Sequence, residues 1–215
     1  MLTVVKRDGR KEELDIKKIQ KYTKDAVDGL RNVSQSELEV DAKIQFRDGM
    51  STAEIQQTLI QTAVDKIDID APDWSFVAAR LFLYDLYHRV GLTIDSCKIQ
   101  SYCDLSSYFE VGEREGRIVP GLKELYDLGE LNAYIKPERD LQFNYLGIKT
   151  LYDRYLLKDR NGDPIELPQQ MFMAIAMFLA QNEKDRMRWA KEFYDVLSKF
   201  EVMAATPTLS NARTP

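Results

Sequence analysis

The chain has 215 residues, which is enough for one large domain or two small ones. Hydrophobic residues make up 44% and charged residues 30% of the chain, and no stretch approaches the roughly 18 consecutive apolar residues of a transmembrane helix. The net charge of -5 does not favour bulk nucleic-acid binding. We expect a cytoplasmic protein with no membrane association, because the start lacks the charge order and cleavage site of a signal peptide.

Basic residues are concentrated at the start of the chain. Residues 1–24 hold eight basic and four acidic residues, so the remainder has 22 basic against 31 acidic residues. A basic segment ahead of an acidic body suggests a local site for an anion such as phosphate.

The cysteine and histidine content argues against the common metal sites. Cys97 and Cys103 are the only cysteines and do not have the spacing of metal ligands, and His88 is the only histidine. Because disulfides are rare in the cytosol, we expect two free thiols.

The first predicted element is a β-hairpin. Leu2–Val5 is a short run rich in β-branched residues, Asp8–Gly9 is a hairpin turn signal, and Lys11–Leu14 supplies the return strand. Asp15 then caps a helix whose apolar residues recur at helical spacing as far as Leu30.

Three further helices are predicted in the first half of the chain. Ser34 and Ser51 each open a capping box, and Asp48–Gly49 breaks the first of these two helices. Asp70–Asp73 ends the second and starts another helix, which carries apolar residues from Trp74 to Leu86.

Residues 1 to about 90 therefore form a hairpin with four helices, and Gly91–Ser96 looks like a connector to a mainly helical second half. Asp159–Pro164 is a turn-rich break, and the tail from Ala204 to Pro215 has no helical pattern. The predicted helices of the second half cover residues 98–115, 119–130, 137–157, 168–182 and 184–201. The fold class is α+β and mostly α.

The basic hairpin is the strongest local signal for chemistry. A helix N-terminus offers free N–H groups and a positive dipole end, and the hairpin can present Lys6 and Arg7 beside the start of the first helix. Lys17 and Lys18 lie in that helix's first turn, where cations oppose the dipole unless an anion joins them. The alternative is a solvated basic hairpin. Neither a GxxxxGK phosphate loop nor a GxGxxG fingerprint occurs, so any nucleotide site must be of another type.

The tail carries a second candidate site. Thr206–Ser210 is a run of hydroxyl residues in which a proline fixes the backbone, and such a loop can bond phosphate oxygens through N–H and O–H groups. The alternative is a frayed C-terminal end.

Several segments, in their order along the chain, resemble parts of ribonucleotide reductases. Val4–Gly9, Ile44–Gly49, Ser51–Ile55, Asp70–Asp73 and Ala78–Arg80 resemble the ATP-cone, the domain that switches the overall activity of many of these enzymes. Lys136–Asp140, Phe143–Tyr145 and Ala205–Thr214 resemble the large (alpha) subunit of class I ribonucleoside-diphosphate reductase. The resemblance implies an ATP-cone over residues 1–92, built as a β-hairpin plus four helices. It implies a helical N-terminal domain of the alpha subunit over 93–215, ending in a substrate-phosphate loop.

The resemblance also implies site residues. Thr206 matches the family residue that binds the substrate diphosphate, and Gln56 and His88 stand where some members have His and Lys at contact positions. The full set of implied ATP/dATP contacts is Lys6, Arg7, Glu12, Glu13, Leu14, Asp15, Ile16, Lys17, Lys18, Thr52, Gln56 and His88.

The activity implied by the resemblance is reduction of ribonucleoside diphosphates for DNA synthesis, under ATP/dATP control with Mg2+. A radical metallocofactor in a beta subunit would generate a cysteine radical in alpha, and thioredoxin or glutaredoxin would supply the reductant. In the family the first reducing cysteine follows the Asn-Ala-Arg-Thr motif, and this chain ends at Pro215 before it. We therefore expect the chain to lack the catalytic cysteines, to need the remainder of the alpha subunit, and to act within an oligomer.

Two other classes of protein compete with this interpretation. A transcriptional regulator built on the same nucleotide-binding domain would need a zinc ribbon, which two cysteines cannot supply. A non-catalytic nucleotide-sensing or helical interaction module remains the alternative, and in the helical form its basic hairpin would simply be exposed.

Overall fold

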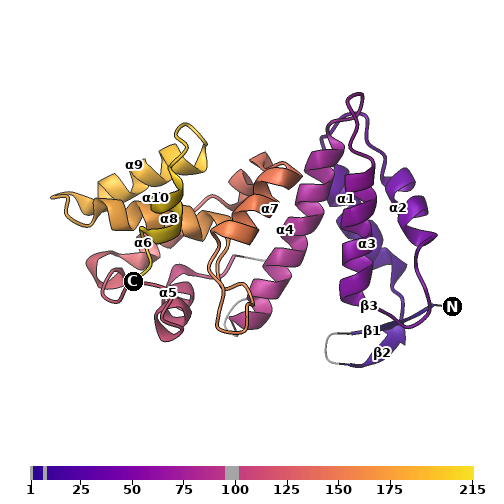
Figure 1. Cartoon of the computed structure of the whole chain (residues 1–215), viewed down its shortest axis with the longest axis horizontal. Coiled ribbons are helices and arrows are strands. Elements are labelled where there is room, and N and C mark those ends of the chain that lie inside the picture. Colours follow the sequence, from indigo (N-terminus) through magenta and orange to yellow (C-terminus); the bar gives the residue numbers. More distant parts are fainter. Residues whose placement is uncertain (1, 7–8, 95–101) are drawn as a thin grey trace. The chain divides into compact units, whose positions relative to one another are not determined.

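The computed structural model describes residues 2–6, 9–94 and 102–215. It divides into two compact units, which are described separately. The N-terminal unit comprises residues 1–85 and 141–149, and the helical unit comprises residues 86–140 and 150–215. Among the described residues most elements are helices, and the three strands lie in the N-terminal unit, as Figure 1 shows. This confirms the predicted fold class.

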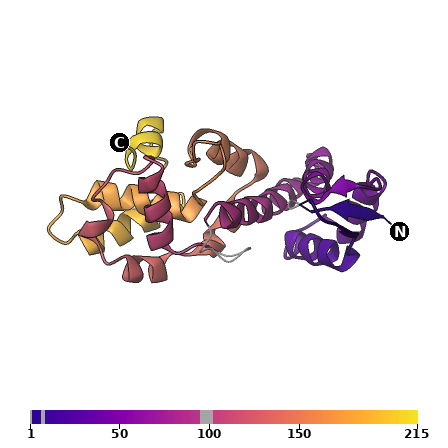
Figure 2. The same cartoon turned by 90° about the horizontal axis from the view of Figure 1, so that it is seen from below.

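A small three-stranded sheet lies beside the helices of the N-terminal unit (Figure 2). β1 (Thr3–Val5) pairs antiparallel with β2 (Lys11–Glu13), which confirms the predicted hairpin. β1 also pairs in parallel with β3 (Met50–Ser51), so the strand order is β2-β1-β3. The sequence analysis did not predict β3, because a two-residue strand has no periodicity to detect.

Four helices complete the N-terminal part of the chain. They are α1 (Ile16–Val27), α2 (Gln35–Lys43), α3 (Thr52–Asp65) and α4 (Trp74–Thr93). The predicted caps are present: the Asp15 side chain accepts from the Lys17 N–H, and Ser34 accepts from the Glu37 N–H. Ser51 and Glu54 form a reciprocal capping box at the start of α3.

Two boundaries differ from those predicted. α2 ends at Lys43, before the predicted apolar position Phe46. α4 continues through Gly91 to Thr93, where the connector was predicted. The reason for the second difference is burial, since Val90 and Ile94 have 0% and 1% exposure and the Ile94 N–H donates to the Val90 carbonyl.

The second half of the chain is a succession of shorter helices. They are α5 (Leu105–Arg114), η1 (Lys123–Leu125), α6 (Leu128–Tyr134), η2 (Pro137–Gln142), α7 (Tyr145–Arg154), α8 (Pro168–Ala180), α9 (Arg186–Ser198) and α10 (Thr206–Asn211). α8 is the core of the helical unit, because its first ten residues are buried, and α9 packs along it. None of the helices in the described ranges has the length and apolar character needed to cross a membrane.

Polar side chains explain why the long predicted helices are interrupted. Asn144 accepts from the Gly147 N–H and so starts α7 inside the predicted helix 137–157. Asp127 accepts from the Glu130 N–H and starts α6 late in the predicted helix 119–130. Asp104 caps α5, so within the described part of predicted helix 98–115 the helix begins only at Leu105.

Two further expectations were wrong. The tail forms the short helix α10, which is held by the buried side chains of Leu209 and Arg213. Cys103 is disulfide-bonded rather than a free thiol, and Cys97 lies outside the described residues. The free-thiol prediction rested only on the redox compartment, which does not determine whether a chain brings a cysteine near a partner.

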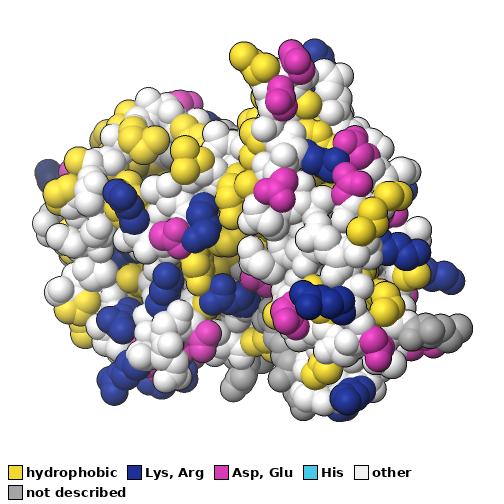
Figure 3. All heavy atoms as spheres, turned by 45° about the vertical axis from the view of Figure 1, so that its right-hand side comes forward, with side chains coloured by type: hydrophobic (Ala, Val, Ile, Leu, Met, Phe, Trp, Pro, Cys, Tyr) yellow, Lys and Arg dark blue, Asp and Glu magenta, His cyan; other side chains and the backbone are white. Residues whose placement is uncertain are grey.

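Both signs of charge occur over the surface. On the face shown in Figure 3, Lys and Arg side chains lie among Asp and Glu side chains. On this face no single sign of charge prevails, so binding of an anion there would depend on local geometry.

Candidate functional site

The parallel pairing of β1 with β3 places Lys6 and Thr52 at the same end of the sheet. Val5 is in register with Ser51, and the next residues are Lys6 and Thr52. Thr52 is also the first residue of α3, so a lysine lies beside the N-terminal turn of a helix. This is an arrangement that suits phosphate.

The helix start beside Lys6 is that of α3, whereas the sequence analysis placed α1 there. The Leu14 N–H donates to the Leu2 carbonyl at 2.9 Å, so the chain enters α1 at the opposite end of β1 from Lys6. The side chain of Asp15 caps that start. The first-turn N–H groups of α1 and the Lys6 amino group thus belong to different ends of the sheet.

Glu12 pairs with Lys6 and also interacts with the charge of Lys18 at the start of α1. Its Oε1 lies 2.7 Å from Lys6 Nζ, and the side chains of Lys6 and Glu12 are 27% and 42% exposed. The hydrogen bond from Lys6 holds the pKa of Glu12 below its usual value, and the charges of Lys6, Lys18 and Arg10 act in the same direction. A group of cations therefore surrounds one carboxylate on the hairpin and on the first turn of α1.

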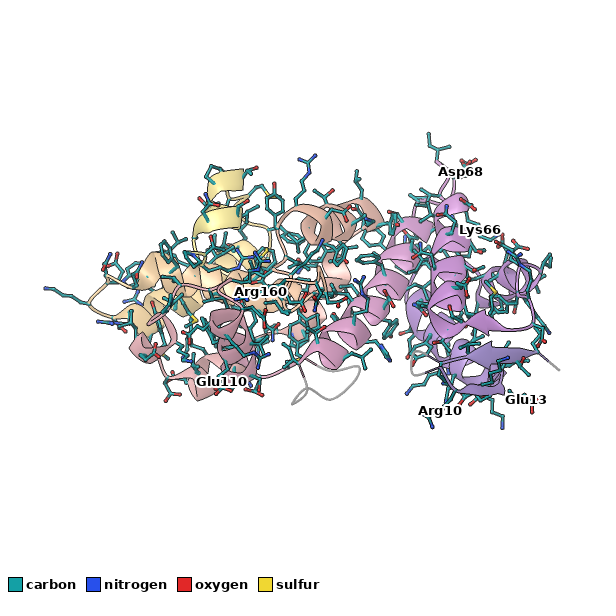
Figure 4. All side chains as sticks on the ribbon, turned by 60° about the horizontal axis from the view of Figure 1, so that its bottom comes forward. Arg10, Glu13, Lys66, Asp68, Glu110 and Arg160 are labelled. Atoms are coloured by element: carbon teal, nitrogen blue, oxygen red, sulfur yellow. The ribbon has the colours of Figure 1, made fainter. Side chains whose placement is uncertain are left out.

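The other implied contacts on the hairpin and the start of α1 are at the surface. Figure 4 shows Arg10 and Glu13 at the outer edge of the N-terminal unit. Leu14 is half-buried, while Glu13, Asp15, Ile16 and Lys17 are exposed. Exposed residues of this kind can approach a bound nucleotide without disturbing the core.

Gln56 has a structural role that the sequence analysis missed. It lies one turn after Thr52 on α3, and its Nε2 donates to the Leu81 carbonyl on α4 at 2.8 Å. This bond ties α3 to α4 within the N-terminal unit. No local pattern in the sequence indicates it, because the partner is a backbone group 25 residues away.

Two other implied residues belong to the helical unit, and one lies outside the described residues. Arg7 lies outside the described residues. His88, on α4, and Thr206, on α10, both fall in the helical unit.

Thr206 begins α10, and its side chain is exposed. Its Oγ1 lies 3.1 Å from the hydroxyl of Tyr155, which follows α7. The sequence analysis did not select Tyr155, because the two residues are 51 positions apart.

A buried cluster around Arg213 was also missed. Arg213 and Glu166 are both 0% exposed, and the guanidinium donates to Glu166 Oε1 and Oε2, each at 2.6 Å. Glu166 further accepts from the Tyr108 hydroxyl at 2.5 Å and the Leu157 N–H at 2.9 Å. Such a charge pair is fully satisfied within the core of the helical unit.

A second buried carboxylate, Asp140, accepts hydrogen bonds from neutral donors. It is 1% exposed, and it accepts from the hydroxyls of Tyr87 and Tyr102 and from Gln169 Nε2, at 2.6, 2.5 and 2.8 Å. Burial raises the pKa of Asp140 to about 6, although these three hydrogen bonds oppose the shift.

Comparison with known proteins finds similarity to ribonucleotide reductases. The ATP cone domain family matches residues 2–89, and the ribonucleotide reductase all-alpha domain family matches residues 141–215. The ribonucleoside-diphosphate reductase subunit alpha of Helicobacter pylori is 70% identical over the whole chain, which covers 26% of that relative. The ribonucleoside-diphosphate reductase 1 subunit alpha of Escherichia coli is 33% identical over the whole chain, which covers 28% of that relative. In Treponema pallidum the corresponding subunit alpha is 39% identical over 74% of the chain and 19% of the relative.

The chain thus spans about a quarter of the length of the curated relatives that it matches along its whole length. The two matched domains occur in the order predicted from the motifs. The chain thus carries an ATP cone domain followed by a ribonucleotide reductase all-alpha domain, and along its whole length it is similar to the alpha subunits of ribonucleoside-diphosphate reductases.

Proposed function

We propose that residues 1–92 sense ATP and dATP and that residues 93–215 form the helical N-terminal domain of the reductase alpha subunit. The observation that carries the first part is the register of β1 and β3, which brings Lys6 beside Thr52 in a segment matched by the ATP cone family. A lysine, a hydroxyl and a helix start together offer charge-assisted and neutral hydrogen bonds to phosphate oxygens.

In this proposal the triphosphate lies at the Lys6 and Thr52 end of the sheet. Arg7 and Gln56 are further proposed contacts, and the stretch from Glu12 to Lys18 contacts the remainder of the nucleotide. ATP and dATP differ by one hydroxyl, so the free-energy coupling that separates their effects is modest, on the order of 1–3 kcal/mol. Binding biases how alpha subunits associate with one another or with beta, because a ligand shifts only an equilibrium whose states it distinguishes.

Mg2+ would enter with the nucleotide. Within the described residues there is no group of three or more His, Cys, Asp or Glu side chains that could hold a metal ion. Mg2+ usually keeps several waters and is held by one or two carboxylates together with phosphate oxygens. Glu12, whose Oε1 lies 2.7 Å from Lys6 Nζ, is one carboxylate that could take part.

The catalytic part of the proposal concerns the whole alpha subunit. Thr206 binds the diphosphate of a ribonucleoside diphosphate through its exposed hydroxyl. The cysteines that reduce the ribose belong to the remainder of the alpha subunit, the radical metallocofactor to the beta subunit, and thioredoxin or glutaredoxin supplies electrons. This chain contributes nucleotide sensing and one part of the substrate site.

Calorimetric titration of the 215-residue chain with ATP and with dATP, each with Mg2+, tests the sensing function. We expect saturable binding of both nucleotides and much weaker binding of a pyrimidine triphosphate. Absence of binding at millimolar adenine nucleotide would reject the site and would favour a helical interaction module with an exposed basic hairpin.

A further inference from the structure

The hydroxyls of Tyr155 and Thr206 form a pair whose hydrogen-bond direction is set by chemistry. Their oxygens are 3.1 Å apart, and either group could donate. A phenolic O–H is a stronger donor than an aliphatic one, and the aliphatic oxygen is the better acceptor. When Tyr155 donates, Thr206 Oγ1 accepts through one of its lone pairs. The Thr206 hydroxyl proton then points away from Tyr155.

One buried guanidinium fixes both members of the pair. Arg213 donates to the Tyr155 carbonyl at 2.8 Å and to the Leu209 carbonyl on α10 at 2.6 Å. The Arg213 carbonyl accepts from the Val119 N–H at 2.9 Å, so the end of α10 is also held by the backbone. The main chain of Tyr155 and that of the Thr206 helix are therefore bonded to the same side chain.

Glu166 in turn fixes the guanidinium. The bidentate pair leaves Arg213 no freedom to rotate away from these carbonyls, and the pair is 0% exposed. An exposed pair of hydroxyls that rests on a buried ion pair is preorganised, since little conformational freedom remains to be lost when a ligand binds.

We propose that Tyr155 is a positioning residue for the substrate diphosphate, because it donates to Thr206 and so presents the Thr206 hydroxyl proton to a phosphate oxygen. This inference rests on the proposed substrate role of Thr206. A chain of hydrogen bonds polarises its members, so the bond from Thr206 to an anionic oxygen is stronger when Tyr155 donates to it.

The test uses the alpha subunit that carries this sequence, assayed with its beta subunit and with cytidine diphosphate as substrate. Tyr155→Phe keeps the ring and the carbonyl that Arg213 binds, and it removes only the hydroxyl. We expect KM to rise about five- to tenfold, the effect of one hydrogen bond, with kcat within about twofold of the unmodified enzyme. Tyr152→Phe, three residues earlier on α7, is the matched control and should leave KM unchanged.

A double-mutant cycle separates positioning from a general structural effect. In a Thr206→Ala background, Tyr155→Phe should cause no further rise in KM, whereas in a Thr206→Ser background it should act as in the unmodified enzyme. Equal rises in KM in the Thr206→Ala and unmodified backgrounds, or no rise in either, would overturn the role of Tyr155. If Thr206→Ala itself leaves KM unchanged, the proposed substrate role of Thr206 fails and the positioning role fails with it.

Discussion

The two units place their charged groups differently. In the N-terminal unit the described ion pairs lie near the surface, as in the Lys6–Glu12 pair and in Lys66, which contacts Glu37 and Asp41 at 2.7 and 2.6 Å. Its buried polar residues among those described are two threonines. The helical unit buries Asp140, Glu166, Gln169, Gln170, Ser198 and Arg213.

This difference matches the roles that we assign to the two units. Exposed charges can exchange one partner for another at little cost, which suits reversible binding of a nucleotide. Buried charges are costly to leave unpaired and therefore hold the surrounding elements in one arrangement. Substitutions of exposed charges in the N-terminal unit should mainly change ligand binding, whereas substitutions of buried charges in the helical unit should mainly change stability.

The largest expected effect is on the buried ion pair. Arg213→Met leaves the Glu166 charge buried beside an apolar side chain, and we expect the free energy of unfolding to fall by about 3–5 kcal/mol. Urea unfolding of the 215-residue chain measures this. The double variant Arg213→Met with Glu166→Gln should recover much of the loss, because no net charge remains and the amide oxygen still accepts a hydrogen bond. A loss below about 1 kcal/mol for Arg213→Met would contradict the contrast between the units.

The next effect is a pH dependence that comes from Asp140. Its pKa in the folded state, about 6, is above the ordinary value of 3.8, so the folded state holds this proton more tightly than the unfolded state does. The corresponding stability is therefore fully present below about pH 4 and is lost as the pH rises through about 6, with a total of about 3 kcal/mol.

Urea unfolding at several pH values between 4 and 7 measures that dependence, with Asp140→Asn as the reference. Asp140→Asn changes the hydrogen bonds and so shifts the free energy of unfolding by a constant amount. It has no carboxyl group at this position that could titrate. We expect the stability of the unmodified chain, relative to Asp140→Asn, to decrease from pH 4 to pH 7. Parallel stability profiles for the two chains would show that Asp140 does not titrate in this window.

The sequence predicted those features that depend on local chemistry. Asp15, Ser34 and Ser51 cap the helices that follow them, and each cap bonds an N–H two or three residues away. Residues brought together from distant positions were not predicted. The pairing of β1 with β3 changed which helix start lies beside Lys6, and neither a hydrophobic pattern nor a turn signal indicates a strand of two residues.

The buried groups of the helical unit escaped prediction for a related reason. A charged residue such as Asp140 or Arg213 is ordinarily exposed, so its type argues against burial unless its partner is known. The partners are distant, with Arg213 47 residues from Glu166 and Asp140 38 residues from Tyr102. Resemblance to the family selected Thr206, while only the structure places Tyr155 beside it.

A smaller effect is expected for Lys6→Ala in the N-terminal unit. Loss of one charge-assisted hydrogen bond should weaken ATP binding about tenfold in calorimetry, with the free energy of unfolding changed by less than about 1 kcal/mol. Lys21→Ala, which removes an exposed lysine from the middle of α1, should leave the affinity unchanged. Equal losses of affinity for the two variants would indicate a diffuse basic surface instead of a site at Lys6.

The smallest effect is expected for two helix caps, both in the N-terminal unit. Ser51→Ala and Ser34→Ala each remove a side chain that accepts a first-turn N–H, at 3.1 and 3.3 Å, and each should lower the free energy of unfolding by about 1 kcal/mol. Only Ser51 adjoins Thr52, so only Ser51→Ala should also weaken ATP binding, by about twofold, because the first turn of α3 frays beside the proposed phosphate position. The pair of variants therefore separates stability from binding within one unit. Weaker ATP binding in Ser34→Ala than in Ser51→Ala would place the nucleotide nearer α2 than α3.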